Sequence, residues 1–149
     1  MKTVKGNLIT LGKKGEFDVI IHGCNCFCTM GAGIAKTIKE EFPEAYHADL
    51  ETKNGDESKL GEISWAKVND GSLIVVNGYT QFNWKGRGRK TDYEAIRKVF
   101  QKVKAQFSGL RIGYPAIGAG LAKGDWQVIS EIINEELDKE DHTFVEFRK

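Results

Sequence analysis

The sequence predicts an α/β fold built on a largely parallel central sheet. Segments typical of strands alternate with segments typical of helices along the 149 residues, and such alternation builds parallel sheets that helices cover. Two of the apolar segments run into glycine-rich loops that precede helical segments. In α/β sheets, loops of this kind place ligands at the carboxyl ends of the strands. The length indicates one domain, residues 1–149.

Six segments have the apolar or alternating composition of strands. The Asn69-Asp70-Gly71 sequence is a turn signal that joins two of them into a hairpin. The predicted strands are residues 3–5, 17–22, 62–68, 73–79, 110–114 and 143–147.

Four segments show the spacing of helices. In the first, Ile34, Ile38 and Phe42 recur every four residues. The third has a long apolar stripe that ends before Gly109, a residue type that commonly terminates helices. The predicted helices are residues 32–42, 44–52, 92–107 and 126–137.

Composition excludes several classes of protein. Lys and Arg number 22 against 21 Asp and Glu, and this balance argues against a dedicated nucleic-acid partner. With 40% hydrophobic and 29% charged residues, the chain is neither disordered nor a membrane protein. The first residues lack the apolar core of a signal peptide. Three cysteines without an export signal predict reduced thiols and a cytoplasmic protein.

Two similar loops stand out because 17 residues are glycine and only 2 are proline. The first leads from the predicted strand 17–22 to Gly31-Ala32-Gly33, and the second contains Gly118-Ala119-Gly120. Glycine lets the backbone approach a ligand, and free N–H groups at a helix start bind anions. Two such loops in one sheet suit a ligand with two phosphates.

Neither loop matches the common nucleotide motifs. The third glycine of G-x-G-x-x-G is replaced by Lys36 in one loop and by Lys123 in the other, and no P-loop is present. The alternative is that these glycines only make strand-to-helix turns.

The two loops, taken together with the His-x-Cys-Asn-Cys sequence at residues 22–26, resemble the macro domain family. The resemblance covers nearly the whole chain and is strongest to the yeast-type ADP-ribose 1″-phosphate phosphatase branch, and the sequence also resembles the small macro proteins of tailed bacteriophages. The segments shared with this phosphatase branch are residues 4–7, 21–26, 31–35, 42–45 and 60–61. Residues 115–121, with Trp126 following, are similar to the sibling branch that removes ADP-ribose from protein and DNA. The resemblance implies a three-layer α/β/α macro domain with a mixed, largely parallel sheet that binds ADP-ribose.

The resemblance also assigns binding roles. It places Gly6, Asn7 and Leu8 at the adenine, and Gly23, Cys24 and Asn25 at the distal ribose. The ribose and one phosphate would contact Met30, Gly31, Ala32, Gly33, Ile34 and Ala35. The diphosphate would contact Ala116, Ile117, Gly118, Ala119, Gly120 and Leu121. From their place at the end of a strand, Tyr79 and Thr80 are further candidates for the pocket lining.

His22 matches the catalytic histidine of the phosphatase branch. A histidine titrates near neutral pH, so it can take a proton from water or give one to the leaving oxygen. The alternative is a strand-end histidine whose nitrogens are satisfied by the backbone. The branch places a carboxylate in the loop where this chain has residues 83–87, and we expect Asp92 to replace it, with a helix N-cap as the alternative. Asp125 is predicted to be an N-cap.

Two further clusters allow more than one interpretation. His22, Cys24, Cys26 and Cys28 would share one face of an extended strand, which permits either a zinc site or simply buried thiols. Residues 84–90 combine Trp84 with Lys85, Arg87, Arg89 and Lys90. They form either a solvated loop, which can act as a lid, or a contact to the ligand or to nucleic acid.

The predicted function is hydrolysis of ADP-ribose 1″-phosphate to ADP-ribose and phosphate, without metal or cofactor. We expect a monomer whose partner is this small molecule and which acts in the cytoplasm, or in the host cytoplasm if the chain is viral. One alternative is an ADP-ribose reader without turnover. Another is a hydrolase that removes ADP-ribosyl groups from protein or nucleic acid, although Ala122 stands where that sibling branch carries an aspartate.

Overall fold

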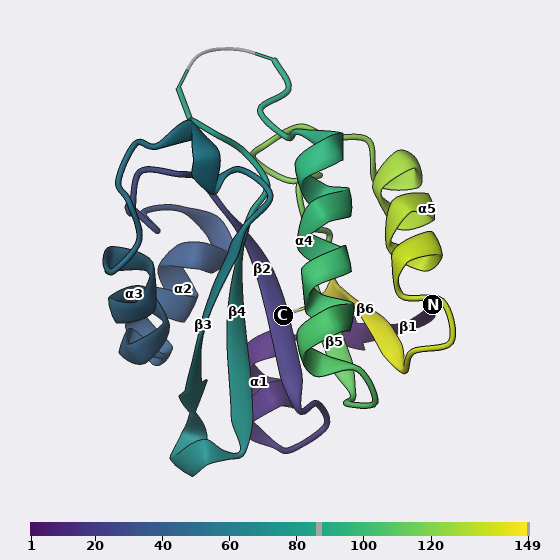
Figure 1. The fold of residues 1–149 in the computed structure, drawn as a ribbon. Helices are drawn as coiled ribbons and strands as arrows, with labels where there is room; N and C mark the ends of the chain where they lie inside the picture. Colours follow the sequence, from purple (N-terminus) through teal and green to yellow (C-terminus); the bar gives the residue numbers. More distant parts are fainter. Residues whose placement is uncertain (86–87, 149) are drawn as a thin grey trace.

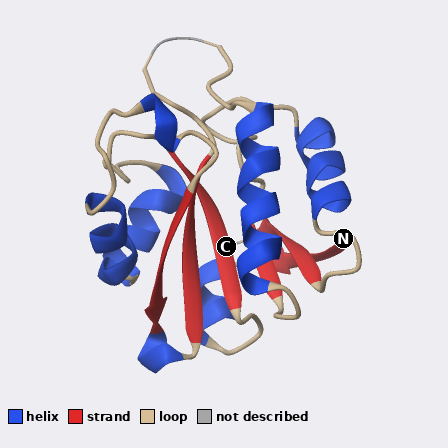
Figure 2. Cartoon of the chain, viewed as in Figure 1, coloured by secondary structure: helices blue, strands red, loops and turns tan. Residues whose placement is uncertain are grey.

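The computed structural model describes residues 1–85 and 88–148. Within these residues the chain forms one six-stranded sheet with the order β1-β6-β5-β2-β4-β3. The strands are red in Figure 2. Neighbouring strands are parallel except β3 and β4, which pair antiparallel. The strands are β1 (Lys2–Gly6), β2 (Val19–Cys24), β3 (Ile63–Val68), β4 (Leu73–Tyr79), β5 (Ile112–Tyr114) and β6 (His142–Phe147).

Helices cover both faces of the sheet (Figure 1). They are α1 (Leu8–Lys13), α2 (Gly33–Glu41), α3 (Pro43–Leu50), α4 (Tyr93–Phe107) and α5 (Trp126–Glu136), with short 3-10 helices η1 (Glu57–Lys59) and η2 (Asn69–Gly71). Ile20 of β2 packs in one core with residues of α1, α2 and α3. Its neighbours Val19 and Ile21 pack in a second core with α4 and α5. The predicted three-layer α/β/α arrangement with a mixed, largely parallel sheet is confirmed.

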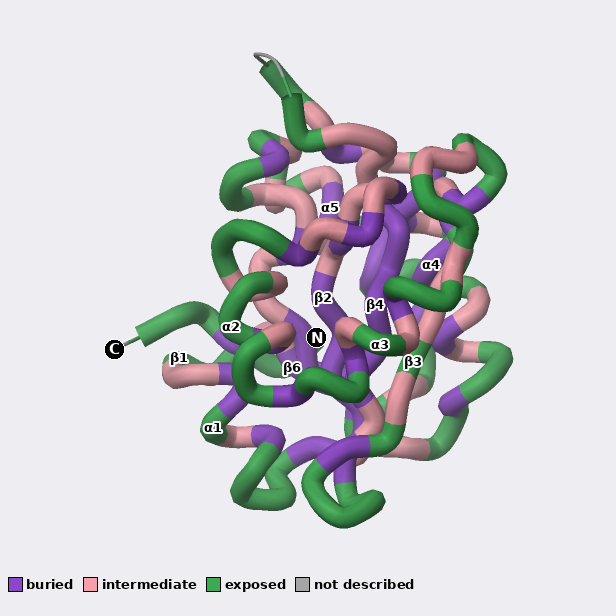
Figure 3. Tube along the Cα trace, turned by 90° about the vertical axis from the view of Figure 1, so that its left-hand side faces the viewer, coloured by how far each residue is buried: buried purple, intermediate pink, exposed green. Residues whose placement is uncertain are grey.

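The centre of the sheet is buried and its β1 edge is exposed. Every residue of β2 except Gly23 is buried, as expected for a parallel strand that helices cover on both faces. In Figure 3, β2 and β4 form the buried middle of the molecule. The hairpin between β3 and β4 turns at Asn69, Asp70 and Gly71, all with positive φ, so the predicted turn is confirmed.

The main difference from the predicted elements is α1, a helix that is not among the predicted segments. Asn7 is the N-cap of α1, and its side chain accepts a hydrogen bond from the Thr10 N–H group at 3.1 Å. Leu8 begins the helix and is buried in the core. At six residues, α1 is too short to show a helical period.

Among the described residues, no helix has the length and apolar character needed to cross a membrane.

Candidate functional site

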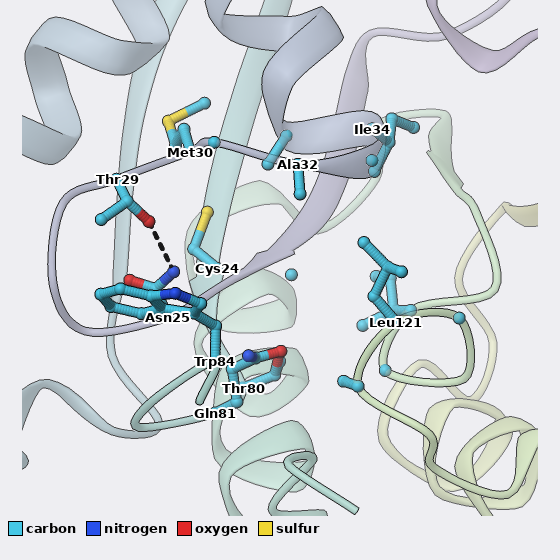
Figure 4. Close-up of a pocket in the computed structure, with 18 of the residues that line it drawn as sticks. Cys24, Asn25, Thr29, Met30, Ala32, Ile34, Thr80, Gln81, Trp84 and Leu121 are labelled. Atoms are coloured by element: carbon cyan, nitrogen blue, oxygen red, sulfur yellow. Dashed lines mark hydrogen bonds between the residues drawn. The ribbon is translucent and has the colours of Figure 1, made fainter. Parts of the chain in front are cut away.

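A cavity of about 530 Å³ lies at the carboxyl ends of the central strands, between the two glycine loops. This volume lies within the range of small-molecule sites, roughly 300–1,000 Å³. In Figure 4, Asn25, Thr29 and Trp84 line one side of the cavity, and Leu121 of the second loop lies on the other. The predicted position of the site, at the ends of the strands that lead into the glycine loops, is the position of this cavity.

Most of the predicted binding residues are brought together here. Those that line the cavity are Gly23, Cys24, Asn25, Met30, Gly31, Ala32, Gly33, Ile34, Ala35, Thr80, Ala116, Ile117, Gly118, Gly120 and Leu121.

Five predicted binding residues lie outside the described lining. Gly6, Asn7 and Leu8 join β1 to α1. The Tyr79 ring is buried below the cavity, with its hydroxyl bonded to Asp49 and Ser64. Ala119 belongs to the second loop, but only its neighbours reach the cavity.

The structure adds lining residues that the predictions omitted, namely Thr29, Asp49, Gln81 and Pro115. Trp84 and Ala122, noted in the sequence for other reasons, also line it. Thr29 and Pro115 adjoin predicted segments, so wider boundaries would have included them. Asp49 carries a different signal, because it stands four residues after Ala45 on the buried face of α3, where an apolar residue is the rule.

Asn25 shapes the first loop. Its Nδ2 donates to the Thr29 hydroxyl at 2.8 Å, and its Oδ1 accepts from the Phe27 N–H at 2.8 Å. The loop also holds Cys28 and Met30 at φ values of 55° and 41°. Left-handed backbone at residues other than glycine is uncommon and clusters at functional sites.

The second loop is shaped around Gly118, which has a φ of 75°. Its carbonyl accepts hydrogen bonds from the Thr91 hydroxyl and from the Gly124 N–H. A Cβ atom at Gly118 would lie 2.8 Å from the Thr91 Oγ1 atom, so this position requires glycine. The two loops come close to each other, because a Cβ atom at Gly33 would lie 3.3 Å from Leu121.

The N-terminus of α2 opens toward this gap. Ala32 is its N-cap, and no side chain among the described residues caps it. The backbone N–H groups of the first turn of a helix have no partner within the helix, and the helix dipole favours negative charge there. The site therefore offers donors to an anion where the sequence predicted a phosphate.

His22 lies beneath the cavity and is not among its described lining residues. The side chain is completely buried, and Nε2 lies 2.6 Å from Oδ1 of Asn77. Burial lowers the pKa of His22 to about 4, against the smaller opposing effect of the Asn77 hydrogen bond. The ring is therefore neutral near pH 7. The thiol of Cys24, which does line the cavity, lies 3.6 Å from the His22 Nε2 atom.

Asp92 and Asp125 both cap helices. The Asp92 carboxylate accepts from the Ala95 N–H at 3.0 Å at the start of α4, and it lies outside the described cavity lining. The Asp125 carboxylate accepts from the Gln127 N–H at 2.9 Å at the start of α5. The N-cap prediction for Asp125 is confirmed. For Asp92 the structure shows the capping alternative.

The cysteines do not continue one strand face, because β2 ends at Cys24. All three thiols are free and buried. Cys26 donates to the Gln81 carbonyl at 3.5 Å, and Cys28 donates to the Asp49 carbonyl at 3.2 Å. Among the described residues, no three His, Cys, Asp or Glu side chains come together as metal ligands.

The basic segment after β4 reaches the cavity through Trp84. The indole contacts the Phe27 ring edge-on at 5.6 Å, and the Lys85 ammonium lies 5.5 Å from the indole. The Arg89 guanidinium stacks on Tyr93 at 4.2 Å. Arg87 lies outside the described residues.

With this geometry established, comparison with known proteins defines the class. The model of the macro domain family matches residues 21–133. The chain therefore belongs to the macro domain family. The Thermus aquaticus DarG macrodomain has the same fold, with a TM-score of 0.75 at 20% identity, and the match covers 99% of this chain and 97% of that one.

Three relatives narrow the similarity further. An uncharacterized 17.5 kDa protein of Enterobacteria phage T4 is 34% identical over 142 residues, which cover 90% of this chain and 88% of the relative. The ADP-ribose glycohydrolase OARD1 of Bos taurus is 30% identical over 141 residues, covering 93% and 84%. An ADP-ribose 1″-phosphate phosphatase of Debaryomyces hansenii is 24% identical over 165 residues, covering 90% and 92%.

Proposed function

We propose that the protein binds ADP-ribose in the cavity between its two glycine loops and hydrolyses ADP-ribose 1″-phosphate to ADP-ribose and phosphate. The observation that carries the proposal is the placement of these loops on opposite sides of one cavity at the ends of parallel strands. Relatives named for ADP-ribose hydrolysis and for ADP-ribose 1″-phosphate hydrolysis support it.

The ligand is placed by the chemistry of the lining. The diphosphate lies between the uncapped start of α2 and residues 116–121, where backbone N–H groups and small side chains admit an anion. The distal ribose lies against Cys24 and Asn25, and the Asn25 amide exchanges its bond to Thr29 for one to a sugar hydroxyl. Gly6, Asn7 and Leu8 are outside the cavity lining, so the adenine contact is not assigned to them.

Turnover depends on His22 in this proposal. The Nδ1 atom of His22 lies 3.8 Å from the Cys24 thiol, and Nε2 is engaged with Asn77. The Cys24 thiol, which lines the cavity, therefore lies against the buried His22 ring.

The proposal is tested by measuring phosphate release from ADP-ribose 1″-phosphate, with a chelator present, for the wild type and for His22→Ala. Calorimetry with ADP-ribose runs in parallel. We expect wild-type turnover that is lost in His22→Ala while ADP-ribose binding is retained. Tight binding without turnover in the wild type would contradict the phosphatase and leave an ADP-ribose reader.

The Asn25 position gives a matched test of binding. Asn25→Asp keeps the oxygen that accepts from Phe27 but replaces the donor to Thr29 by a negatively charged oxygen. We expect ADP-ribose affinity to fall at least tenfold, since a carboxylate repels an anionic ligand, with a melting temperature close to that of the wild type. Equal affinity would place the ligand away from Asn25.

A second candidate is hydrolysis of ADP-ribosyl groups attached to protein or nucleic acid, which the 30% identity to the Bos taurus glycohydrolase favours. The same preparation is assayed for ADP-ribose release from ADP-ribosylated protein and ADP-ribosylated DNA. Release of ADP-ribose without release of phosphate from the small substrate would select this candidate.

A further inference from the structure

The cavity has one carboxylate in its described lining, and that carboxylate is Asp49 of α3. The described lining contains no histidine, lysine, arginine or glutamate, and its other titratable group is the thiol of Cys24. Asp49 is 1% exposed. An acid–base step at a ligand in this cavity therefore has Asp49 as its carboxylate.

The two oxygen atoms of Asp49 have different surroundings. Oδ1 accepts a hydrogen bond from the Tyr79 hydroxyl at 2.7 Å. Oδ2 is buried and has no hydrogen-bond partner among the residues that the structure describes. A buried acceptor without a partner costs about 1–3 kcal/mol, so its retention calls for an explanation such as a catalytic role.

The charge of Lys59 acts on the Asp49 carboxylate, but Lys59 is not its hydrogen-bond partner. Its ammonium donates to the Cys26 carbonyl at 3.2 Å and lies 3.5 Å from the Cys28 thiol. It also lies 4.6 Å from the Tyr79 ring centroid. Within residues 1–85 and 88–148, no ion pair joins Lys59 to Asp49.

A chain of hydrogen bonds, half-buried at Ser64 and buried at its other members, ends at Asp49. It starts at His22, whose Nε2 lies 2.6 Å from Oδ1 of Asn77. The Nδ2 atom of Asn77 donates to the Ser64 hydroxyl at 3.0 Å, and the Ser64 hydroxyl lies 2.7 Å from the Tyr79 hydroxyl. The Tyr79 hydroxyl has one proton and donates it to Asp49. In the contact between the Ser64 and Tyr79 hydroxyls, Ser64 is therefore the donor and the Tyr79 oxygen the acceptor. Every donor in the chain thus points toward the Asp49 carboxylate, which the chain holds as its final acceptor.

We propose that Asp49 is the general acid–base residue of this cavity, with its unpaired Oδ2 atom as the atom that exchanges the proton. The proposal rests on the function proposed above, which places the distal ribose at Cys24 and Asn25. Asp49 lines the same cavity as Cys24 and Asn25, and the Cys28 thiol of the first loop donates to the Asp49 backbone carbonyl at 3.2 Å.

The step balances for ADP-ribose 1″-phosphate. Asp49 Oδ2 is buried, so the step requires the carboxyl group to turn toward the cavity. A water oxygen then forms a bond to phosphorus while Oδ2 accepts one proton of that water. The bond from phosphorus to the anomeric oxygen breaks, and its electron pair stays on that oxygen. Asp49 then returns the proton to this oxygen, so that water and substrate give ADP-ribose and phosphate.

The environment of Asp49 favours such a role. Burial raises the pKa of the Asp49 carboxyl group, and the Tyr79 hydrogen bond and the Lys59 charge oppose this effect to a smaller extent. The groups that face Asp49 are Tyr79, Lys59, and the thiols of Cys24, Cys26 and Cys28. A carboxylate with a raised pKa is a stronger base than an exposed one.

The experiment compares wild type, Asp49→Asn and Glu51→Gln. Glu51 is an exposed residue two positions along the chain, so its replacement makes the same chemical change outside the cavity. We expect Asp49→Asn to lower kcat for phosphate release about 100-fold or more, while ADP-ribose affinity stays within about threefold. Glu51→Gln keeps the wild-type kcat.

A second variant, Tyr79→Phe, leaves the carboxylate in place and removes its hydrogen-bond donor. Because that bond lowers the pKa of Asp49, its loss should move the acid limb of the kcat–pH profile to higher pH. This readout holds even if Asp49→Asn fails to fold, and a merely structural role for Asp49 would not produce it.

The outcomes separate the two proposals. An active wild type whose Asp49→Asn variant keeps kcat within threefold, or whose acid limb does not move in Tyr79→Phe, would overturn the role of Asp49 and leave the proposed function standing. A wild type that releases no phosphate would overturn both.

Discussion

The Nε2 atom of His22 lies 2.6 Å from the Oδ1 atom of Asn77, and both side chains are completely buried. The two residues are register partners in the parallel strands β2 and β4, so the sheet itself sets the contact. Asn77 donates its own amide protons to the Ala45 carbonyl and to Ser64. Its oxygen is therefore an acceptor, and His22 carries its proton on Nε2.

The burial of His22 predicts a pH dependence of folding. Its pKa is lowered from 6.5 to about 4, so between these pH values the unfolded chain binds a proton that the folded chain does not. The free energy of unfolding should therefore rise with pH across this window, by about 3 kcal/mol from this residue. The contribution is complete above pH 6.5 and lost below pH 4. Urea unfolding at several pH values measures it.

His22→Gln is the control, since an amide can donate to Asn77 without titrating. His142, whose pKa burial also lowers, is present in both proteins, so the difference between them isolates His22. Equal pH dependence in the two proteins would contradict a neutral, buried His22.

The sequence predicts the two glycine loops, but it does not predict the hydrogen-bond chain from His22 to Asp49. Residues 31–33 and 118–120 are local glycine patterns next to strands, and a local pattern is readable without a fold. The chain from His22 to Asp49 depends on the register of β2, β3 and β4 and on the packing of α3. Sequence periodicity contains no information on register between strands, so Asn77 was not a candidate. Asp49 is detectable in the sequence only as a polar residue four positions after Ala45 on the buried face of α3.

Asp92 illustrates a different difficulty, because a carboxylate before a helix has the same sequence signal whether it caps or catalyses. The structure shows the cap, with the Ala95 N–H 3.0 Å from the carboxylate. Asn caps as well as Asp, so Asp92→Asn should leave both the melting temperature and turnover near their wild-type values. Asp92→Ala should cost about 1 kcal/mol of stability. Loss of turnover in a stable Asp92→Asn protein would instead return Asp92 to the catalytic site.

The second glycine loop offers a matched pair of substitutions. Alanine at Gly118 must adopt a φ of 75° and brings Cβ to 2.8 Å from Thr91 Oγ1, which together cost about 2–4 kcal/mol. At Gly120, Cβ meets no atom within 4 Å among the described residues. We therefore expect Gly118→Ala to be strongly destabilised and Gly120→Ala to unfold like the wild type in urea.

Gly120→Ala also reports on the ligand, because Gly120 lines the cavity. A methyl group there occupies space that the proposed function gives to a phosphate, so ADP-ribose affinity should fall in this stable variant. Unchanged affinity measured by calorimetry would place the diphosphate away from Gly120.

Trp84 provides a direct optical test of where the nucleotide binds. It is one of three tryptophans in the chain, and it lines the cavity with 47% of its surface exposed. The other two lie outside the described lining, where Trp65 packs against Phe107 and Trp126 against Phe144. Ligand binding should therefore change the emission of Trp84 alone, since its indole exchanges water for ligand.

We expect an ADP-ribose titration to change tryptophan emission in the wild type and in Trp65→Phe, and to lose most of that change in Trp84→Phe. Trp84→Ala removes an indole that lines the cavity, and loss of an aromatic contact to the ligand of about 0.5–1.5 kcal/mol should weaken affinity by roughly 2- to 12-fold. If Trp84→Phe keeps the full emission change, the ligand lies outside the cavity. Because Asn25, Asp49 and Gly120 line that same cavity, such a result would count against their proposed contacts with the ligand as well.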